Sequence, residues 1–488
     1  MSDPSLDTPP QESPATDIPP ASSSTAKESE AGSTLYAAHK KIYVRSTSGL
    51  FARWRWTLVW LTQVIFFGLP WLTWNGRQAV LLHLVERKFY IFSWVFWPQD
   101  VLFLSVLLII SAYSLFFFTA VAGRLWCGYA CPQTVYTEIF QWIEEKIEGD
   151  HVARAKLDKA PMSGRKFAIK SLKYMVWAVF ALWTGFTLVS YFSPVKELLA
   201  SIPTFGFGPW ERFWIFFYGT FTFVFAGSLR EQVCRYMCPY ARFQSVMFDP
   251  DTMVVTYDEA RGEPRGFRRR GEDPAAARGE CIDCGICVQV CPTGVDIRNG
   301  LQYECIGCGV CIDACDPIMD KLNQPRGLVR YTTENALKQG WETSEITHHI
   351  MRPRTLIYGT ILIGIIMAFF WGLFARIPMR VDVIRDRTPT GRVVSGGMVE
   401  NDYMLRFMNM TESTQTFVIS VDGLDGIHIS SDKQQVTVDP LRNQEEIMVV
   451  QAPKESGQVG SNRIYFEIVS VDDPNMKRRE KAAFLYPK

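Results

Sequence analysis

Five separate apolar runs constrain the fold of this chain more than any other feature of its sequence. They span residues 56–74, 101–122, 172–192, 213–229 and 355–375, and the fourth is the shortest. A helix needs roughly 20 apolar residues to cross a bilayer. Core helices of a large soluble protein are the alternative, but five such long runs disfavour it. The sequence therefore predicts a multi-pass membrane protein with a five-helix α transmembrane bundle.

The Lys and Arg residues between these runs predict the orientation of the bundle. The segment 75–100 carries three of them and 193–210 carries one. Short loops that are rich in Lys and Arg stay on the cytoplasmic side of a membrane. The loop 123–171 is expected on that side, because it carries eight: Arg124, Lys146, Arg154, Lys156, Lys159, Arg165, Lys166 and Lys170.

This orientation divides the chain between the two sides of a bacterial cytoplasmic (inner) membrane. The N-terminus and residues 230–354 are expected in the cytoplasm, and residues 376–488 in the periplasm. All 12 cysteines lie between Cys127 and Cys315, which places them on the cytoplasmic side. Thiols stay reduced in that compartment, so the cysteine positions agree with an orientation that they were not used to derive.

Eight of the cysteines lie close together in two similar runs, "CIDCGICVQVC" and "CIGCGVCIDAC". Each has the spacing C-x2-C-x2-C-x3-C of bacterial two-cluster ferredoxins, in which the fourth cysteine of each run binds the other cluster. A zinc site would instead use paired spacings. The predicted ligands are Cys281, Cys284, Cys287 and Cys315 for one [4Fe–4S] cluster, and Cys305, Cys308, Cys311 and Cys291 for the other.

The remaining four cysteines form two Cys-x-x-x-Cys-Pro motifs, each just after an apolar run: Cys127 and Cys131 before Pro132, and Cys234 and Cys238 before Pro239. Residues i and i+4 share one face of a helix, so each pair could bind one ion, and the proline would start or kink the next turn. Soft thiolates select copper(I), zinc or iron–sulfur centres. Copper reduction, a further iron centre and disulfide cycling are all compatible with four thiols, whereas isolated buried cysteines would act as small hydrophobes.

The last part of the chain alternates apolar and polar residues in short runs that are separated by turn residues. This pattern predicts an antiparallel, immunoglobulin-like β-sandwich of about seven or eight strands. The expected organisation then begins with a tail at 1–50, which is rich in Ser and Pro and disordered in its first part. Four membrane helices follow at 51–229, and a cytoplasmic α+β ferredoxin domain at 230–354 has its core at 275–322. A fifth membrane helix at 355–375 leads to a periplasmic β-sandwich at 376–488.

The sequence also bears on partners. It has no dinucleotide-binding glycine fingerprint and no phosphate loop, so electrons are expected from an unknown cytoplasmic donor. The net charge of +1 gives no indication of nucleic acid. A group of arginines predicts attraction to anionic membrane lipid, with docking of an acidic electron donor as the alternative: Arg261, Arg265, Arg268, Arg269, Arg270 and Arg278.

Taken together, these features resemble the cytochrome c oxidase accessory protein CcoG family, also called FixG or RdxA, whose members are polyferredoxin-like membrane proteins. The resemblance rests on the five apolar runs, the segments "WCGYACPQTVY" and "CRYMCPYARFQ", the paired ferredoxin motifs and the C-terminal β-domain. It implies a cupric reductase that converts copper(II) to copper(I) for the copper centre of a C-type (cbb-type) cytochrome c oxidase. It makes Cys127, Cys131, Cys234 and Cys238 candidates for a catalytic, copper-proximal site, and oxidase subunits or copper chaperones candidate partners.

Two other functions fit the same motifs. One is a quinol-oxidising relay like the respiratory membrane ferredoxins, which would need a quinone pocket between the helices. The other is a non-enzymatic assembly scaffold or redox sensor whose β-domain binds oxidase subunits. The sequence leaves the oligomeric state open, a homodimer included.

Overall fold

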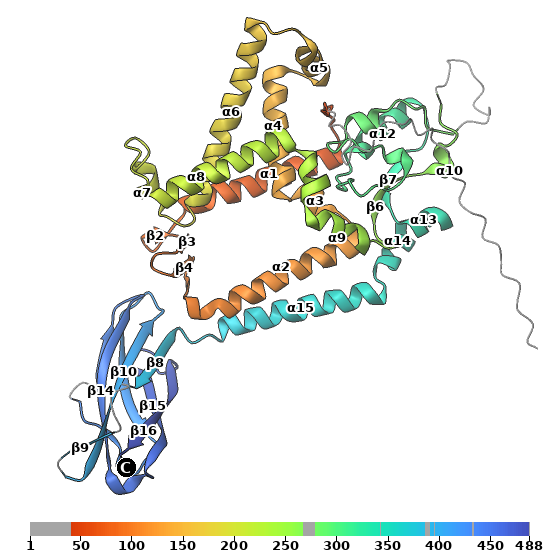
Figure 1. The fold of residues 1–488 in the computed structure, drawn as a ribbon. Helices are drawn as coiled ribbons and strands as arrows, with labels where there is room; N and C mark the ends of the chain where they lie inside the picture. The colour runs from red at the N-terminus through yellow and green to blue at the C-terminus, as the bar shows by residue number, and fades with distance from the viewer. Residues whose placement is uncertain are drawn as a thin grey trace, which may run out of the picture. The chain divides into compact units, whose positions relative to one another are not determined.

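The computed structural model describes residues 41–266, 279–341, 343–385, 391–394, 396–431 and 434–487 (Figure 1). Most of the expected N-terminal tail, residues 1–40, therefore lies outside the described residues. The elements that position the cysteines are helices at the ends of apolar segments, two short cysteine-rich helices and one small two-stranded sheet.

Three helices within the described ranges are long and apolar enough to cross a membrane. They are α2 (Val101–Ala122), which a short preceding turn extends to Pro98, α6 (Gly164–Val189) and α15 (Pro353–Phe374). Helices α2 and α15 lie side by side (Figure 1), and Phe103 of α2 contacts Phe369 of α15 edge to face. These helices agree with the second, third and fifth apolar runs, so the expected membrane helices are confirmed in part.

The first apolar run differs from its expected extent. Helix α1 covers Leu50–Gly68 rather than 56–74, and residues Thr73–Trp74 form the short strand β1. Pro70 follows the helix in a single 3-10 turn, because proline lacks the N–H that the next helical hydrogen bond would need. The earlier start brings Arg53 and Arg55 into the helix, so its first turns are not purely apolar.

The fourth apolar run is also interrupted. It forms α8 (Pro209–Thr222) followed by the π-helical turn η3 (Phe223–Leu229). Helix α8 packs closely on α6, since a Cβ at Gly185 would lie 2.3 Å from the carbonyl oxygen of Ile215. Small residues let helix backbones approach in this way. Neither α1 nor α8 is among the three helices that meet the length and composition of a span, so the five-helix bundle is not confirmed in its expected form.

The segment 123–171, expected as a loop, is largely helical. It contains α3 (Leu125–Tyr129), α4 (Pro132–Glu148) and α5 (His151–Lys159), and α6 begins within it at Gly164. One face of α4 is apolar, and Phe140 packs on Trp177 of α6 with ring centroids 5.2 Å apart. The apolar face of α4 is therefore buried by a helix that follows it in the chain.

A buried ion-pair network joins α4 to α6. The fully buried Glu144 carboxylate lies 2.7 Å from Arg230, 3.3 Å from Lys173 and 3.6 Å from Arg154. Buried charges need such partners, because their transfer out of water is costly. This network fixes the position of Arg230, which begins the segment that leads to Cys234.

Between α1 and α2 the structure has two small sheets that the sequence did not predict. Strand β1 pairs with β2 (Arg77–Gln78), and β3 (Val80–His83), β4 (Lys88–Ile91) and β5 (Trp94–Phe96) form an antiparallel sheet. Strands of two to four residues are too short to show a clear alternation.

The cysteine-rich segment is an α+β unit. Strands β6 (Val254–Tyr257) and β7 (Val329–Thr332) pair antiparallel, with Val255 opposite Tyr331. The segment also contains the helices and turns η4 (Val233–Met237), α9 (Pro239–Met247), α10 (Glu259–Gly262), α11 (Ile286–Gln289), η5 (Ile297–Asn299), α12 (Val310–Lys321), α13 (Glu334–Gln339) and α14 (Thr343–Ile350).

The C-terminal part is an antiparallel β-sandwich, as expected, with nine strands among the described residues rather than seven or eight. One sheet has the order β12-β14-β10-β8 with β9 on β10, and the other has the order β13-β11-β15-β16. Phe407 and Phe417 stack between the sheets and are fully buried. The strands are β8 (Met379–Arg385), β9 (Arg392–Val394), β10 (Met398–Asn409), β11 (Gln415–Asp422), β12 (His428–Ile429), β13 (Gln435–Val438), β14 (Asn443–Pro453), β15 (Gly460–Ser470) and β16 (Lys477–Tyr486).

Candidate iron–sulfur centres

Two cavities in the α+β unit are lined by cysteines. The first is lined by Cys281, Cys284, Cys287 and Cys315, together with apolar side chains and Arg298. Gly285 sits between Cys284 and α11 with a φ of +64°, a conformation that glycine adopts without steric cost. This turn brings Cys287, on α11, back toward the two cysteines of the preceding loop.

The second cavity repeats this arrangement. It is lined by Cys305, Cys308, Cys311 and Cys291, and Cys287 of the first set also borders it. Gly309, with a φ of +72°, stands before α12 as Gly285 stands before α11. Each cavity thus gathers three cysteines of one run and the fourth cysteine of the other run.

The Cys-x-x-x-Cys-Pro motifs do not form continuous helices, so the expectation of two thiols on one helix face is wrong. Cys127 lies in α3, which ends at Tyr129, and the extended backbone of Cys131 leads into α4. Pro132 occupies the first turn of α4, where its missing N–H is not needed.

The second motif has the same construction. Cys234 lies in the π-helical turn η4, and Cys238 stands in extended conformation directly before α9, whose first turn contains Pro239. The prolines therefore start the next helices, as expected. A break in the helix between the two cysteines of each motif changes the direction in which the thiols can point.

The four thiols of these motifs are gathered in one place. Burial and the neighbouring thiols of Cys131, Cys234 and Cys238 raise the pKa of Cys127 to about 12, and Arg124 opposes the rise. Burial likewise raises the pKa of Cys234 to about 12, with Cys131 and Cys238 adding to it. The Cys127 thiol also donates a hydrogen bond of 3.4 Å to Gln244 of α9, so the two motifs meet in the fold although they are far apart in the sequence.

The first Cys-x-x-x-Cys-Pro motif touches the loop that lines the second cavity. A Cβ at Gly128 would lie 2.8 Å from the carbonyl oxygen of Ile306 and 3.0 Å from the Cα of Cys308. The Tyr129 hydroxyl donates a hydrogen bond of 3.0 Å to the Cys308 carbonyl oxygen. The second motif is linked to the same loop, since Arg235, directly after Cys234, forms an ion pair of 3.2 Å with Glu304, directly before Cys305.

Comparison with known proteins identifies these regions. A family model described as a 4Fe-4S dicluster domain matches residues 229–334, and one described as a 4Fe-4S binding domain matches residues 104–149. A third, described as the IG-like fold at the C-terminal of FixG, matches residues 369–487. The matched regions contain all 12 cysteines and the β-sandwich.

Three curated relatives match most of the chain. Protein RdxB of Cereibacter sphaeroides is 38% identical over 414 residues, 83% of this chain and 87% of the relative. Protein RdxA of the same organism is 39% identical over 404 residues, 81% and 85%. Nitrogen fixation protein FixG of Rhizobium meliloti is 35% identical over 424 residues, 80% of each.

The chain belongs to the FixG/RdxA family. It is an iron–sulfur electron-transfer protein with ferredoxin domains of the 4Fe–4S class and an immunoglobulin-like C-terminal domain. The resemblance seen in the sequence is confirmed at the level of the family. The copper chemistry that the resemblance implied is not part of what these comparisons establish.

The cysteine-lined cavities of this FixG/RdxA-family chain fit iron–sulfur clusters. Burial raises the pKa of Cys287 to about 11, and raises those of Cys305 and Cys315 to about 12. Thiols in such surroundings become thiolates only beside a strong cation such as cluster iron. Among the described residues, no three His, Cys, Asp or Glu side chains converge tightly enough for one metal ion, and a cubane holds its four thiolates at separate corners.

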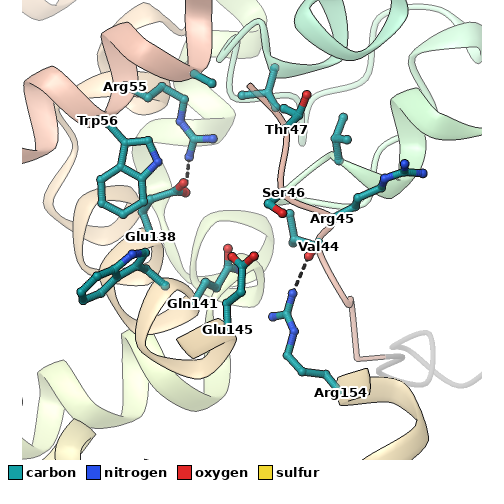
Figure 2. Close-up of a pocket in the computed structure, with 14 residues that line it drawn as sticks. Val44, Arg45, Ser46, Thr47, Arg55, Trp56, Glu138, Gln141, Glu145 and Arg154 are labelled. Atoms are coloured by element: carbon teal, nitrogen blue, oxygen red, sulfur yellow. Dashed lines mark hydrogen bonds and ion pairs between the residues drawn. The ribbon is translucent and has the colours of Figure 1, made fainter. Parts of the chain in front are cut away.

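A polar cavity of about 80 Å³ is lined by residues 44–47 and by side chains of α1, α4 and α5, and Val290 and Val310 also border it (Figure 2). Arg55 of α1 reaches Glu138 of α4 at 2.6 Å, and Arg154 donates to the Val44 carbonyl oxygen at 2.5 Å. The Arg55 guanidinium is buried and interacts electrostatically with Cys308 and Cys291. A buried Arg55–Glu138 ion pair therefore lies near the second cysteine set.

Sequence reasoning missed Arg55, Glu138 and Gly128 as site residues. The one available signal was an arginine directly before an apolar run, and its partner is 83 positions away. The arginine group expected at the membrane surface is described only in part. Arg261 pairs with Glu280 at 2.5 Å and Arg265 with Glu263 at 3.7 Å, while Arg268, Arg269, Arg270 and Arg278 lie outside the described residues.

Proposed function

We propose that this chain is a membrane-bound cupric reductase, in which iron–sulfur clusters pass single electrons to copper(II). The resulting copper(I) would serve the assembly of the copper centre of a C-type (cbb-type) cytochrome c oxidase. One observation carries the relay. Cys287 borders both cysteine-lined cavities, and the loop of Cys308 touches Gly128, next to Cys127. The segments that carry the three sets of cysteines are therefore neighbours in the fold.

In this proposal the ferredoxin cysteines bind two clusters, and the set that contains Cys284 receives the electron. Cys284 is exposed, whereas Cys308 of the second set is buried against the segment after α2. A cytoplasmic one-electron donor can therefore reach the first cluster more readily. The proposed ligands are Cys281, Cys284, Cys287 and Cys315 for the first cluster, and Cys305, Cys308, Cys311 and Cys291 for the second.

The thiols of Cys127, Cys131, Cys234 and Cys238 form the exit of the relay in this proposal. Reduction of copper(II) to copper(I) takes one electron and no proton, which matches a carrier that delivers one electron at a time. Soft thiolate surroundings favour copper(I) over copper(II). Oxidase subunits or copper chaperones would then receive the reduced ion.

The proposal is tested by copper(II) reduction in vitro. The full chain, purified without oxygen and reduced by dithionite that is then removed, is mixed with copper(II) and a copper(I)-specific chelator. We expect copper(I) to form in proportion to the reduced clusters. The variants Cys127→Ser and Cys234→Ser should lose most of this activity. The control variant Val246→Ser, altered at an exposed position on α9, should keep it. Undiminished activity in both cysteine variants, with ferredoxin clusters intact, would remove these thiols from the reaction.

A second candidate function, quinol oxidation, is favoured by one observation. A groove of about 400 Å³ between α1, α2 and α3 is lined by apolar and aromatic side chains, including Trp54, Phe118 and Trp126. Tyr129 borders this groove, and its hydroxyl donates a hydrogen bond to the Cys308 carbonyl oxygen. Bleaching of the clusters by a reduced quinol analogue under argon, lost in Trp126→Ala, would favour this function. No bleaching by the quinol, with full bleaching by dithionite, would exclude it.

The proposed function includes a membrane topology with α1 and the α8–η3 segment as two further spans. The ferredoxin unit would face the cytoplasm and the β-sandwich the periplasm. A reporter enzyme that is active only in the periplasm should be active when fused after Lys488 and inactive when fused after Glu148. The opposite pattern would reverse the orientation.

A further inference from the structure

We propose that the polar cavity between residues 44–47, α1, α4 and α5 binds the head group of an aminophospholipid, that is, a phosphodiester joined to a primary ammonium group. None of the 12 cysteines, all of which the structure describes, lines this cavity. The proposal goes beyond electron transfer. It rests on the membrane topology proposed above, in which α1 is a span, and not on the copper chemistry.

The cavity holds buried polar groups that lack a partner in the protein. The Gln141 side chain is 8% exposed and makes no hydrogen bond among the described residues. Arg154 is 3% exposed, and its Nε atom has no hydrogen-bond partner in the part of the chain that the structure describes. Such groups are costly to bury. The volume of about 80 Å³ exceeds the roughly 10–15 Å³ that one water molecule needs, so the cavity has room for a polar ligand.

Charges of both signs face the cavity (Figure 2). Arg55 and Glu138 neutralise each other as an ion pair. Of the other lining residues, Arg45 and Arg154 supply positive charge, and Glu145 supplies a carboxylate that forms no ion pair among the described residues. A ligand that carries an anion and a cation close together matches this lining, whereas a simple anion or a metal ion would meet a group of its own sign.

Arg154 keeps positive charge to offer, although it belongs to the buried ion-pair network. Its guanidinium lies 3.6 Å from Glu144, a carboxylate that Arg230 and Lys173 share. Among the described residues, this network joins four cations to three carboxylates: Arg154, Lys170, Lys173 and Arg230 with Glu144, Glu148 and Asp158. One positive charge therefore remains uncompensated, and Arg154 is the member of the network that lines the cavity.

The lining assigns each part of the head group to its own residues. The hydroxyls of Ser46 and Thr47 line the cavity with Arg45. Phosphate oxygens accept hydrogen bonds from hydroxyl groups and, more strongly, from guanidinium groups. The phosphodiester is therefore assigned to Arg45 and Arg154 together with these hydroxyls, and the ammonium group to Glu145.

The cavity lies where α1 would enter the membrane. Trp56 of α1 and Trp142 of α4 both border it, and their rings pack edge to face with centroids 6.4 Å apart. Tryptophan is enriched at the membrane–water interface. Trp60 and Val64 follow Trp56 at intervals of four residues, which places them on the same face of α1, and they are 60% and 66% exposed. The acyl chains of a bound lipid can lie along this face.

The edge of the cavity is accessible and amphipathic. Arg45 and Ser46 are exposed at one part of its lining, and Trp142 is exposed at another. A lipid can therefore enter with its head group toward the polar residues and its chains toward the aromatic ones, and no helix has to move apart.

The site also touches the segment that joins α1 to the ferredoxin unit. The Arg45 N–H donates a hydrogen bond of 2.9 Å to the Gln289 carbonyl oxygen of α11. Val290, which follows α11, and Val310, at the start of α12, border the cavity. A bound head group thus contacts both the membrane helix and the cysteine-bearing unit, and it holds that unit at the membrane surface.

The experiment is native mass spectrometry of the full chain, purified in detergent without oxygen, freed of copurified lipid and titrated with one short-chain lipid at a time. Phosphatidylethanolamine is the probe. Phosphatidylglycerol has the phosphodiester without the ammonium group, and phosphatidylcholine has a trimethylated nitrogen that cannot donate a hydrogen bond. We expect one saturable site that binds phosphatidylethanolamine about tenfold more tightly than the other two lipids, as one charge-assisted hydrogen bond predicts.

Two variants test the two halves of the site. Glu145→Gln should weaken phosphatidylethanolamine binding about tenfold and leave phosphatidylglycerol binding unchanged, since it removes only the partner of the ammonium group. Arg45→Gln should weaken the binding of both lipids, since it removes a phosphate contact. Glu334→Gln, at an exposed position of α13, is the matched control and should change neither affinity.

Three results would overturn the proposal. One is equal affinity for the three lipids in the unaltered chain, which indicates adventitious surface lipid. The second is phosphatidylethanolamine binding that neither Glu145→Gln nor Arg45→Gln weakens. The third is binding that depends on Arg45 but not on Glu145, which indicates a site for phosphate alone.

Folding and the proposed function are checked separately. A variant that misfolds also loses the absorbance of its iron–sulfur clusters, and the comparison of the three lipids on the unaltered chain needs no variant. Because the titration contains no copper, loss of lipid selectivity with intact copper(II) reduction would refute this inference alone. Selective lipid binding without copper(II) reduction would support the lipid site and exclude the reductase.

Discussion

Gly128 packs against residues 306–308 of the loop that lines the second cysteine cavity, so a larger side chain at this position should destabilise that loop. An alanine at this position would place its Cβ 2.8 Å from the Ile306 carbonyl oxygen, 3.0 Å from the Cys308 Cα and 3.2 Å from the Cys308 nitrogen. All three are backbone atoms, which cannot rotate away as a flexible side chain can. The two segments would therefore have to separate by about half an ångström to reach ordinary contact.

The size of the effect follows from two opposing contributions. Overpacking of a close contact costs about 1–3 kcal/mol, whereas alanine favours helix over glycine by up to about 1 kcal/mol. Gly128 lies in α3 and does not have a positive φ, so the backbone itself imposes no further cost. We expect Gly128→Ala to destabilise the ferredoxin unit by about 1–2 kcal/mol, and Gly128→Val to destabilise it more.

The assay is thermal loss of cluster absorbance without oxygen, combined with hydrogen exchange of peptides that cover residues 303–311. About 1 kcal/mol should lower the Tm by roughly 2–8 °C, depending on the size of the cooperative unit, and exchange should increase in this loop first. Gly164→Ala is the control, because no atom lies within 4 Å of its added Cβ. Equal Tm and equal exchange in the two variants would refute the contact as the origin of cluster-loop stability.

Three further predictions concern charged groups. Glu144→Gln should lower the free energy of unfolding by about 3–5 kcal/mol, since it leaves the buried Arg230 guanidinium without its carboxylate. The thermal midpoint measures this change, and the substitution Glu334→Gln at an exposed position should alter it little. The hydrogen bond from Arg298 lowers the pKa of Asp296. The contribution of the ionised Asp296 carboxylate to stability is therefore present at neutral pH and down to the ordinary carboxyl pKa of about 4, and it is lost as the pH falls through the lowered pKa. If stability depends on acid pH in the same way in Asp296→Asn and in the unaltered chain, this reasoning is contradicted. Arg376, between α15 and β8, pairs with Asp100 at 2.5 Å and donates to the Val95 carbonyl oxygen. Asp100→Asn should therefore speed limited proteolysis of the segment between α15 and β8. An unchanged cleavage rate would show that the Arg376–Asp100 ion pair does not hold this segment.

Local patterns in the sequence were sufficient for several parts of this protein. The length of the apolar runs determined α2 and α15, because a membrane-spanning helix satisfies its own backbone hydrogen bonds and needs only enough apolar residues. The alternation of residues after Met379 determined the β-sandwich, since one face of each strand must be buried. Cysteine spacing indicated iron–sulfur clusters, because three thiols within seven residues can surround one corner of a cubane.

Other features depended on contacts between distant segments, which local patterns do not encode. The segment 123–171 was expected as a loop, yet α4 is helical and buries Phe140 against Trp177, which lies 37 positions further along the chain. The start of α1 includes Arg55, whose charge is balanced by Glu138 of that same helix α4. A charged or amphipathic segment folds according to the partners that the rest of the chain provides.

The candidate site shows the same division. The sequence singled out Cys127, Cys131, Cys234 and Cys238, but it placed each pair on one face of a continuous helix, whereas the chain breaks the helix before Cys131 and Cys238. The meeting of the two motifs, and the contact of Gly128 with the Cys308 loop, became visible only in the tertiary structure. Residue type and spacing determine which chemistry is available, and packing between segments a hundred or more residues apart determines which of the thiols share a site.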